Sequence, residues 1–259
     1  MSLVQYIPNF SDSVDNRDVR YVSVIMGQSN IDGRTDVSSL PVDIVNPATN
    51  VKIFDGGWQN FNSTLPPARD APATKYAHDL LMLTRLAENI GQDVYCVKES
   101  RGGTSLQQSD NVKGDFNINS TGSNDLYLPL VRLINSSKNY VENVEGRRFV
   151  IPFLLMDIGE TDSTIGDKTT FKLSATQFIN AIKVIAENVD LPVIWRELGL
   201  YQTGVNQDFI DAQNELQEEI TSLTLIPNTG LTLFDAYHLD DASVNSVSNQ
   251  VLAIVEPLY

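Results

Sequence analysis

Two residues of this chain have the types and neighbours needed for nucleophilic chemistry. Ser29 comes two residues after Gly27, just past the apolar run Tyr21–Met26, and His238 comes three residues after Asp235. A serine hydroxyl becomes a good nucleophile when a base removes its proton. A histidine whose Nδ1–H donates to an Asp can be that base through Nε2. Taken alone, each motif is also compatible with a simple turn or a surface pair.

Polar clusters follow several of the predicted strands. They are Gly27–Asn30, Arg101–Ser105, Gly159–Asp162 and Asp235–His238. In an open α/β sheet, residues just past the carboxyl ends of the strands meet along one edge, where ligands bind. We therefore expect the four clusters to converge into one active site.

The elements that would position these clusters alternate between strands and helices. Apolar runs predict strands at Tyr21–Met26, Val94–Val97, Phe149–Met156, Pro192–Trp195 and Leu231–Phe234, with an edge strand at Val51–Phe54. Helical spacing of apolar residues predicts helices at Ala73–Ile90, Leu126–Val144, Phe171–Asn188, Asp208–Leu223 and Val244–Val255. This alternation predicts a mostly parallel sheet of five main strands with helices on both faces.

Composition narrows the choice of partners. The chain has 259 residues, 42% of them hydrophobic, and a formal net charge of −15. The negative charge argues against nucleic acid and anionic membranes as partners, and fits a small neutral or weakly charged substrate better. No apolar run approaches the roughly 18 residues that span a bilayer. The oligomeric state is not predicted.

Two other reactive side chains receive structural interpretations. Cys96 is the only cysteine and lies in an apolar strand, so we expect a core thiol and no intramolecular disulfide. His78 falls opposite the apolar stripe of its helix, so we expect it to be solvated. With so few His and Cys residues and no ligand-spacing motif, we expect no metal site and no cofactor.

Together the clusters resemble the SGNH hydrolase superfamily, and within it the carbohydrate acetylesterases that include sialate O-acetylesterases and acetylxylan esterases. The G-Q-S-N block of that branch is matched by Gly27–Asn30, its G-G-T block by Gly102–Thr104, and its D-x-x-H block by Asp235 and His238. The agreement extends over about Val22–Val255. The resemblance implies a flavodoxin-like three-layer α/β/α sandwich with a mostly parallel five-stranded sheet.

The resemblance also implies roles for individual residues. Ser29 would be the nucleophile, His238 the general base and then acid, and Asp235 the residue that orients His238. The backbone N–H groups of Ser29 and of Gly102 or Gly103 would bind the oxyanion. The implied reaction is hydrolysis of O-acetyl esters on a carbohydrate through an acyl-enzyme, without a cofactor.

The third block departs from the family pattern. The family has a Gln whose amide helps to bind the oxyanion, whereas this chain has Ile158 at that position. Losing one such donor lowers the rate by roughly 10²–10³, unless Gln28, Asn30 or Thr104 replaces it. A weak or inactive carbohydrate-binding protein on the same scaffold is therefore an alternative, and an SGNH lipase or thioesterase is another.

Further charged residues fall near the expected site. Glu160 and Asp162 would support the oxyanion loop or the histidine, or else accept hydrogen bonds from loop amides. Arg34, Arg69 and Arg101 would lie in or near the cleft, where an arginine could pair with the carboxylate of an acidic sugar such as a sialic acid. Surface positions are the alternative for all three arginines.

The polar N-terminus is interpreted as a separate segment. We divide the chain into an arm or linker at residues 1–20 and an esterase domain at residues 21–259. The arm lacks the basic-then-apolar order of a signal peptide. A cytoplasmic protein, a virion-associated protein and a secreted protein that has lost its leader are all compatible with it.

Overall fold

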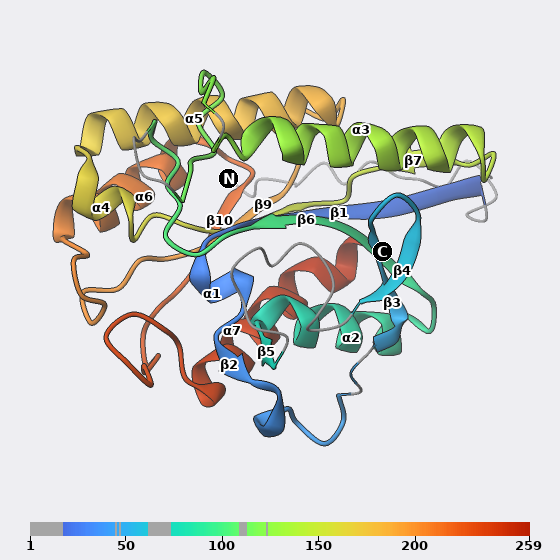
Figure 1. Cartoon of the computed structure of the whole chain (residues 1–259), viewed down its shortest axis with the longest axis horizontal. Helices are drawn as coiled ribbons and strands as arrows, with labels where there is room; N and C mark the ends of the chain where they lie inside the picture. Colours follow the sequence, from blue (N-terminus) through green and yellow to red (C-terminus); the bar gives the residue numbers. More distant parts are fainter. Residues whose placement is uncertain (1–17, 45, 47, 62–73, 109–112, 123) are drawn as a thin grey trace, which may run out of the picture.

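The computed structural model describes residues 18–44, 46, 48–61, 74–108, 113–122 and 124–259. Its centre is a mostly parallel sheet between two layers of helices (Figure 1). Five parallel strands lie in the order β6-β1-β8-β9-β10, which is the 2-1-3-4-5 order of flavodoxin-like sheets. These strands are β1 (Val19–Gly27), β6 (Val94–Ser100), β8 (Leu154–Asp157), β9 (Val193–Arg196) and β10 (Leu223–Ile226). The predicted fold class is confirmed.

Both faces of the sheet are covered because alternate residues of its strands are apolar. Along β1, Val24 and Met26 belong to one core cluster and Ile25 to the other. This is the composition expected of parallel strands buried on both faces. One layer holds α3 (Tyr127–Asn143), α5 (Lys168–Ile185) and α6 (Gln207–Glu219); the other holds α1 (Ser29–Asp32), α2 (His78–Ile90) and α7 (Asp241–Val255) (Figure 1).

The remaining elements are short. The sheet is extended beyond β6 by β3 and then β4, and β7 pairs with β1. A second sheet pairs β2 with β5. Their bounds are β2 (Thr35–Asp36), β3 (Ala48–Phe54), β4 (Trp58–Phe61), β5 (Lys75–Tyr76), β7 (Arg148–Val150), α4 (Asp162–Ile165), η2 (Val37–Ser39) and η3 (Glu256–Leu258). The predicted edge strand is therefore internal, because β4 pairs with it on its outer side.

The last predicted strand is wrong. Residues 231–234 form a loop, and the edge strand β10 is Leu223–Ile226, which lies next to the predicted helix end. The error has a local cause: α6 ends at Glu219 because Ile220 is extended, with φ −112° and ψ 95°, and no Gly or Pro marks the change. The consequence matters for function, since the loop after β10 carries Asp235 and His238.

Two other boundaries differ from the predictions. The predicted strand 149–156 is divided into β7 and β8 by an irregular segment that contains Pro152, which has no N–H to donate. Helix α2 begins at His78 because Lys75–Tyr76 form β5, while residue 73 lies outside the described residues. Its predicted end is confirmed, since Gly91 adopts the left-handed conformation with φ 66°.

Two further expectations concern the chain as a whole. Strand β1 begins at Val19, so the last two residues of the expected arm already belong to the sheet, and residues 1–17 are outside the described part. The division at residue 20 stays an expectation. Among the helices that the structure describes, none is long and apolar enough to cross a membrane. Cys96 is fully buried as expected, and burial raises the pKa of its thiol.

Candidate active site

A glycine at the end of β1 brings the serine turn against the neighbouring strand. Gly27 has a φ of 153°, and a Cβ at this position would lie 2.2 Å from the backbone oxygen of Asp157 on β8. No other residue type fits without separating the two strands. Helix α1 begins two residues later at Ser29. The serine therefore lies at the carboxyl end of the central strand, where the strand order reverses.

The histidine is held by the aspartate three residues before it. Nδ1 of His238 lies 2.7 Å from Oδ2 of Asp235, whose Oδ1 accepts the backbone N–H groups of Tyr237 at 2.7 Å and His238 at 2.8 Å. Partial burial raises the pKa of Asp235, but the hydrogen bonds from His238 and these amides outweigh it, so the pKa is lowered. The carboxylate thus stays ionised and can accept from the imidazole.

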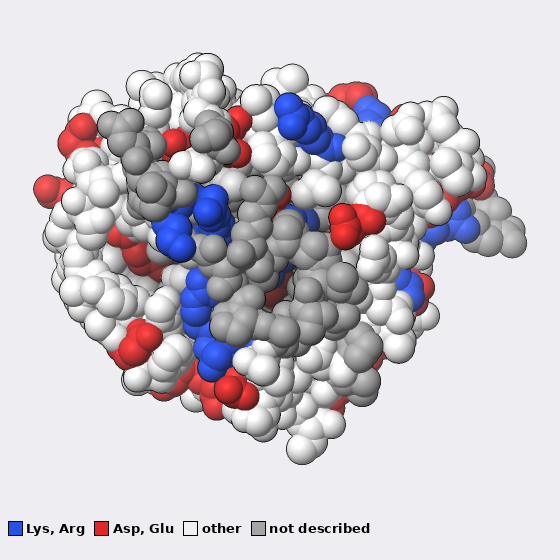
Figure 2. Space-filling view, in the orientation of Figure 1, with Lys and Arg blue, Asp and Glu red and all other residues white. Residues whose placement is uncertain are grey.

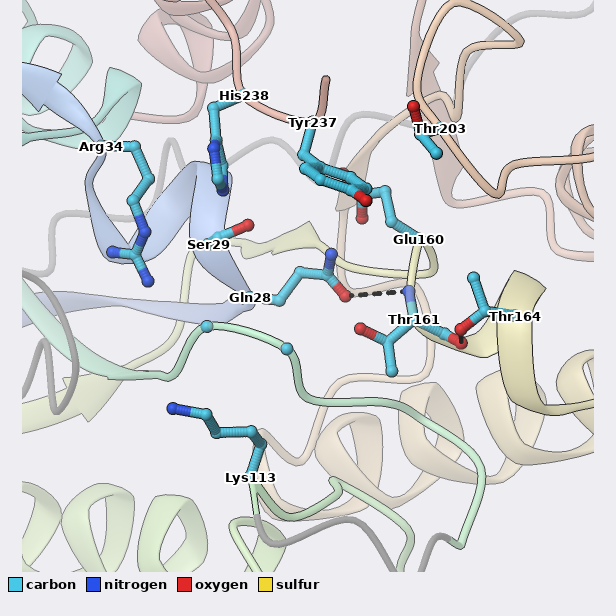
Figure 3. Close-up of a pocket in the computed structure, with 12 residues that line it drawn as sticks. Gln28, Ser29, Arg34, Lys113, Glu160, Thr161, Thr164, Thr203, Tyr237 and His238 are labelled. Carbon is cyan, nitrogen blue, oxygen red and sulfur yellow. Dashed lines mark hydrogen bonds between the residues drawn. The ribbon is translucent and has the colours of Figure 1, made fainter. Parts of the chain in front are cut away.

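One pocket brings the serine and the histidine together. Figure 3 shows the His238 imidazole extending towards Ser29, with a ring nitrogen nearest to the serine. The pocket has a volume of about 590 Å³. Its lining residues are Gln28, Ser29, Arg34, Gly102, Gly103, Lys113, Glu160, Thr161, Thr164, Thr203, Tyr237 and His238.

The two glycines that follow β6 form another wall of this pocket. A Cβ on Gly102 would lie 3.7 Å from the Cβ of Ser29 and 2.3 Å from Nη2 of Arg34. Glycine at this position therefore leaves room for the Arg34 guanidinium beside the serine. It also leaves the backbone of Gly102 exposed to the pocket without an intervening side chain.

Of the three proposed replacement donors, only Gln28 lines the pocket. Its Oε1 accepts the backbone N–H of Thr161 at 3.4 Å (Figure 3), and its Nε2 makes no hydrogen bond within the described part of the chain. Thr104 is fully buried and donates to the carbonyl oxygen of Arg101 at 2.9 Å. The structure thus places Thr104 in the turn and outside the pocket.

Asn30 supports the histidine loop instead of facing the pocket. Its Nδ2 donates to Oε1 of Glu160 at 3.1 Å and to the Tyr237 carbonyl oxygen at 3.3 Å, and its Oδ1 accepts the backbone N–H of Leu239 at 3.0 Å. Two of these partners, Tyr237 and Leu239, lie immediately before and after His238. Asn30 therefore connects the turn that carries the serine to the loop that carries the histidine.

A buried ion pair fixes Glu160 beneath the same loop. Arg196, at the end of β9, pairs through Nη2 with Glu160 and with Asp157, the latter at 2.8 Å. Gln202 donates through Nε2 to Oε1 of Glu160 at 3.0 Å and to the Tyr237 carbonyl oxygen at 2.9 Å. Glu160 thus orients two amides, those of Asn30 and Gln202, that both hold the residue preceding His238.

The interpretation of His78 is wrong. The residue is fully buried, and its Nε2 lies 2.9 Å from Oδ2 of Asp157. Burial raises the pKa of Asp157, but Arg196 and His78 outweigh this effect and hold it well below its usual range. Helical spacing misplaced His78 because it starts α2, where the face that it presents lies under the carboxyl end of β8.

Asp162 accepts hydrogen bonds from loop amides, which is one of the two roles expected from the sequence. Its Oδ1 accepts the backbone N–H groups of Leu106 at 3.0 Å and Gln107 at 2.8 Å. Burial raises the pKa of this carboxyl to about 7, against the effect of these hydrogen bonds. Asp162 therefore fixes the segment that follows the two glycines.

The position of the family's glutamine contributes no donor to the pocket. Ile158 is fully buried in the core, and its carbonyl oxygen accepts Nε1–H of Trp195 at 2.9 Å. Among the arginines, Arg34 lines the pocket and pairs with Asp32 at 2.9 Å, Arg101 is outside the lining, and Arg69 is outside the described residues.

Several lining residues had no signal in the sequence. Lys113 and Thr203 lie in irregular loops, where no periodicity predicts the direction of a side chain. Tyr237 could have been noticed, because it lies inside the D-x-x-H motif. No group of three or more His, Cys, Asp or Glu side chains suited to a metal ion occurs in the described regions.

Several solved structures share the fold of this chain. A protein from Arabidopsis thaliana is 16% identical, with a TM-score of 0.67 and coverage of 92% of this chain and 97% of its own. A carbohydrate acetylesterase from Xanthomonas citri is 12% identical, with a TM-score of 0.60 and coverage of 91% and 55%. The structure of NanS is 12% identical, with a TM-score of 0.63 and coverage of 92% of this chain and 97% of its own. These likenesses show that the chain shares the fold of these proteins.

The family follows from the sequence itself. Residues 19–253 match the family described as carbohydrate esterase, sialic acid-specific acetylesterase. The chain belongs to this family and is a carboxylic ester hydrolase, as the three matching blocks indicated. A comparison with curated protein sequences gave no match.

Proposed function

We propose that the protein removes O-acetyl groups from a sugar by a serine mechanism. Ser29 Oγ attacks the acetyl carbonyl carbon while Nε2 of His238 takes the serine's proton. The imidazolium then gives this proton to the sugar oxygen as its bond to the acetyl carbon breaks, so that the sugar leaves with a free hydroxyl. A water activated by His238 releases acetate from the acyl-enzyme. The main support is a single observation: Ser29 shares its pocket with an imidazole whose Nδ1 is held 2.7 Å from Asp235.

The oxyanion would be bound largely by backbone groups. The N–H of Ser29 opens helix α1, and within the described residues no backbone hydrogen bond occupies it or the N–H of Gly102. Nε2 of Gln28 is the third candidate, because it faces the pocket from the residue next to the serine. It would replace the donor that Ile158 cannot supply.

The pocket favours an acidic sugar over an acyl chain. Arg34 and Lys113 both line it, although the chain carries a net charge of −15. Figure 2 shows Lys and Arg side chains gathered over α1 and β2 on this face. Threonines supply much of the remaining wall. A sugar carboxylate would find cationic partners here, which an uncharged acyl chain cannot use.

Measuring the rate of acetate release tests this proposal. We expect the wild type to deacetylate O-acetylated sialic acid and 4-nitrophenyl acetate, and Ser29→Ala to lose at least about 10³-fold of the rate. Ser136→Ala, on the exposed face of α3, is the matched control and should keep full activity. Equal rates for Ser29→Ala and the wild type would contradict the nucleophile assignment. Faster turnover of octanoyl than acetyl esters would instead support a lipase or thioesterase.

The buried Ile158 favours one alternative, a protein that binds the sugar without turnover. The alternative predicts sugar binding with no labelling of the serine by a fluorophosphonate. Labelling that disappears in Ser29→Ala would exclude it.

A further inference from the structure

A second pocket adjoins the one that holds the serine. It has a volume of about 440 Å³, and Arg34 lines both pockets. Its other walls include Phe234 from the histidine loop, Lys75 from β5, and Asp240 and Asp241 at the start of α7. The proposed deacetylation of a single sugar makes no use of this space.

An aromatic ring connects the two pockets. Phe234 stacks on His238, with ring centroids 5.8 Å apart and an angle of 23° between the planes. Its backbone N–H also donates to the carbonyl oxygen of His238 at 3.1 Å. Nevertheless the residue is 54% exposed. Because this exposed ring lines the second pocket beside the histidine, it offers an apolar face to a molecule that binds there.

The polar groups of the second pocket suit a neutral sugar. Three carboxylates line it, those of Asp36, Asp240 and Asp241, against the two cations Arg34 and Lys75. Asp36 pairs with Lys75 at 3.3 Å, and Asp240 accepts the backbone N–H of Ser243 at 2.9 Å.

One carboxylate remains available in this pocket. Asp241 is exposed, and its side chain makes no hydrogen bond within the described part of the chain. Carboxylate oxygens accept hydrogen bonds from hydroxyl groups, and a sugar ring presents its C–H face to an aromatic ring. Asp241 and Phe234 therefore supply both contacts that a pyranose uses, without the cationic surplus that would draw a second acid.

We propose that the second pocket binds the neutral sugar to which the acetylated acidic sugar is glycosidically linked. The acetylated unit occupies the pocket with Ser29, and its neighbour lies against Phe234 with a hydroxyl on Asp241. The protein then acts on the end of a glycan in preference to a free monosaccharide. This inference rests on the proposed function, because it assigns the neighbouring unit of the same substrate.

The experiment compares one acetyl ester in two contexts. O-acetylated sialic acid is supplied free or linked to galactose, and kcat/KM is measured for both. We expect the wild type to prefer the linked form about tenfold, and Asp241→Ala to reduce that ratio to near one through KM. Asp208→Ala, an exposed aspartate in the first turn of α6, is the control and should keep the preference.

Equal kcat/KM for the free and linked sugars, or a preference unaffected by Asp241→Ala, would contradict the proposal that the second pocket binds the neutral sugar. Its failure can be told apart from failure of the deacetylation itself. Turnover of 4-nitrophenyl acetate that depends on Ser29 tests the chemistry alone. Calorimetric binding of the linked sugar to Ser29→Ala, with and without Asp241→Ala, tests the pocket without turnover.

Discussion

Asn30 donates a hydrogen bond to Glu160 over 3.1 Å, although the two residues are 130 positions apart in the chain. The first follows the serine, and the second belongs to the loop after β8. Glu160 connects the serine turn to Arg196, and Asn30 connects it to the histidine loop. The relative position of Ser29 and His238 therefore depends on a buried polar network that itself lies behind the reacting groups.

Gln202 should position the histidine without touching substrate. Gln202→Leu removes the donor to the Tyr237 carbonyl oxygen and leaves Oε1 of Glu160 with fewer partners. We expect kcat to fall about tenfold with KM little changed, because one hydrogen bond to a positioning group is worth about 1–1.5 kcal/mol. Gln207→Leu, at an exposed position of α6, is the control. An unchanged kcat in Gln202→Leu would show that Asn30 holds the loop alone.

Gln28 should replace the missing oxyanion donor. Gln28→Glu keeps an oxygen that can accept the N–H of Thr161 but loses the Nε2 donor. We expect kcat to fall by roughly 10²–10³, because one oxyanion donor is worth about 2.7–4 kcal/mol. The kcat of Gln28→Leu, which introduces no charge, should fall by a similar factor. If Gln28→Leu kept the wild-type kcat, the oxyanion would be bound by backbone groups alone.

Gly102 should be needed for the position of Arg34. A Cβ at this position comes 2.3 Å from the guanidinium, which Asp32 holds at 2.9 Å, whereas its contact with Ser29 is an ordinary 3.7 Å. We therefore expect Gly102→Ala to raise KM for an acidic sugar ester more than for neutral 4-nitrophenyl acetate. Gly57→Ala is the control, because its Cβ would meet no atom within 4 Å. Equal effects on both substrates would argue against a role for Arg34 in charge recognition.

Stability should depend on pH through Asp157. Its pKa is lowered to about 2 in the folded protein, from an ordinary value of 3.8. The unfolded chain therefore binds a proton more readily, and the contribution of Asp157 is present above about pH 4 and lost as the pH falls through about 2. We expect Asp157→Asn to be less stable at pH 7, by about 3–5 kcal/mol, because it removes one of the two carboxylates that pair with the buried Arg196 and replaces the carboxylate that His78 contacts.

Urea unfolding between pH 2 and 7 measures this effect. The difference in unfolding free energy between wild type and Asp157→Asn should shrink as the pH is lowered from 4 to 2. Asp190→Asn, at an exposed position, controls for the general effect of removing a carboxylate. A difference that stays constant over this range would contradict the assignment to Asp157.

The sequence predicted the parts of the site that short motifs specify. Ser29, Asp235 and Gly102 lie in motifs whose residue types are dictated by a turn or by an adjacent hydrogen bond. The parallel sheet was equally accessible, because apolar β-branched runs are required wherever both faces of a strand are covered.

The supporting network was not accessible from the sequence in the same way. His78 is a polar residue that helical spacing places on a solvated face, and Arg196 lies just past the predicted strand Pro192–Trp195. Only long-range contacts explain the burial of both residues. The strand β10 was missed because Ile220 ends α6 without a sequence signal. Partners that are distant in the chain leave no mark in local spacing.

The close approach of Gly27 to Asp157 has a consequence for how the protein fails. Two adjacent strands meet there with no side chain between them. The turn that positions the serine therefore depends on the pairing of these two strands. Separation of these two strands would displace the Ser29 hydroxyl. Loss of catalysis on heating should therefore coincide with loss of the β-sheet, without an earlier stage in which a folded but inactive protein accumulates.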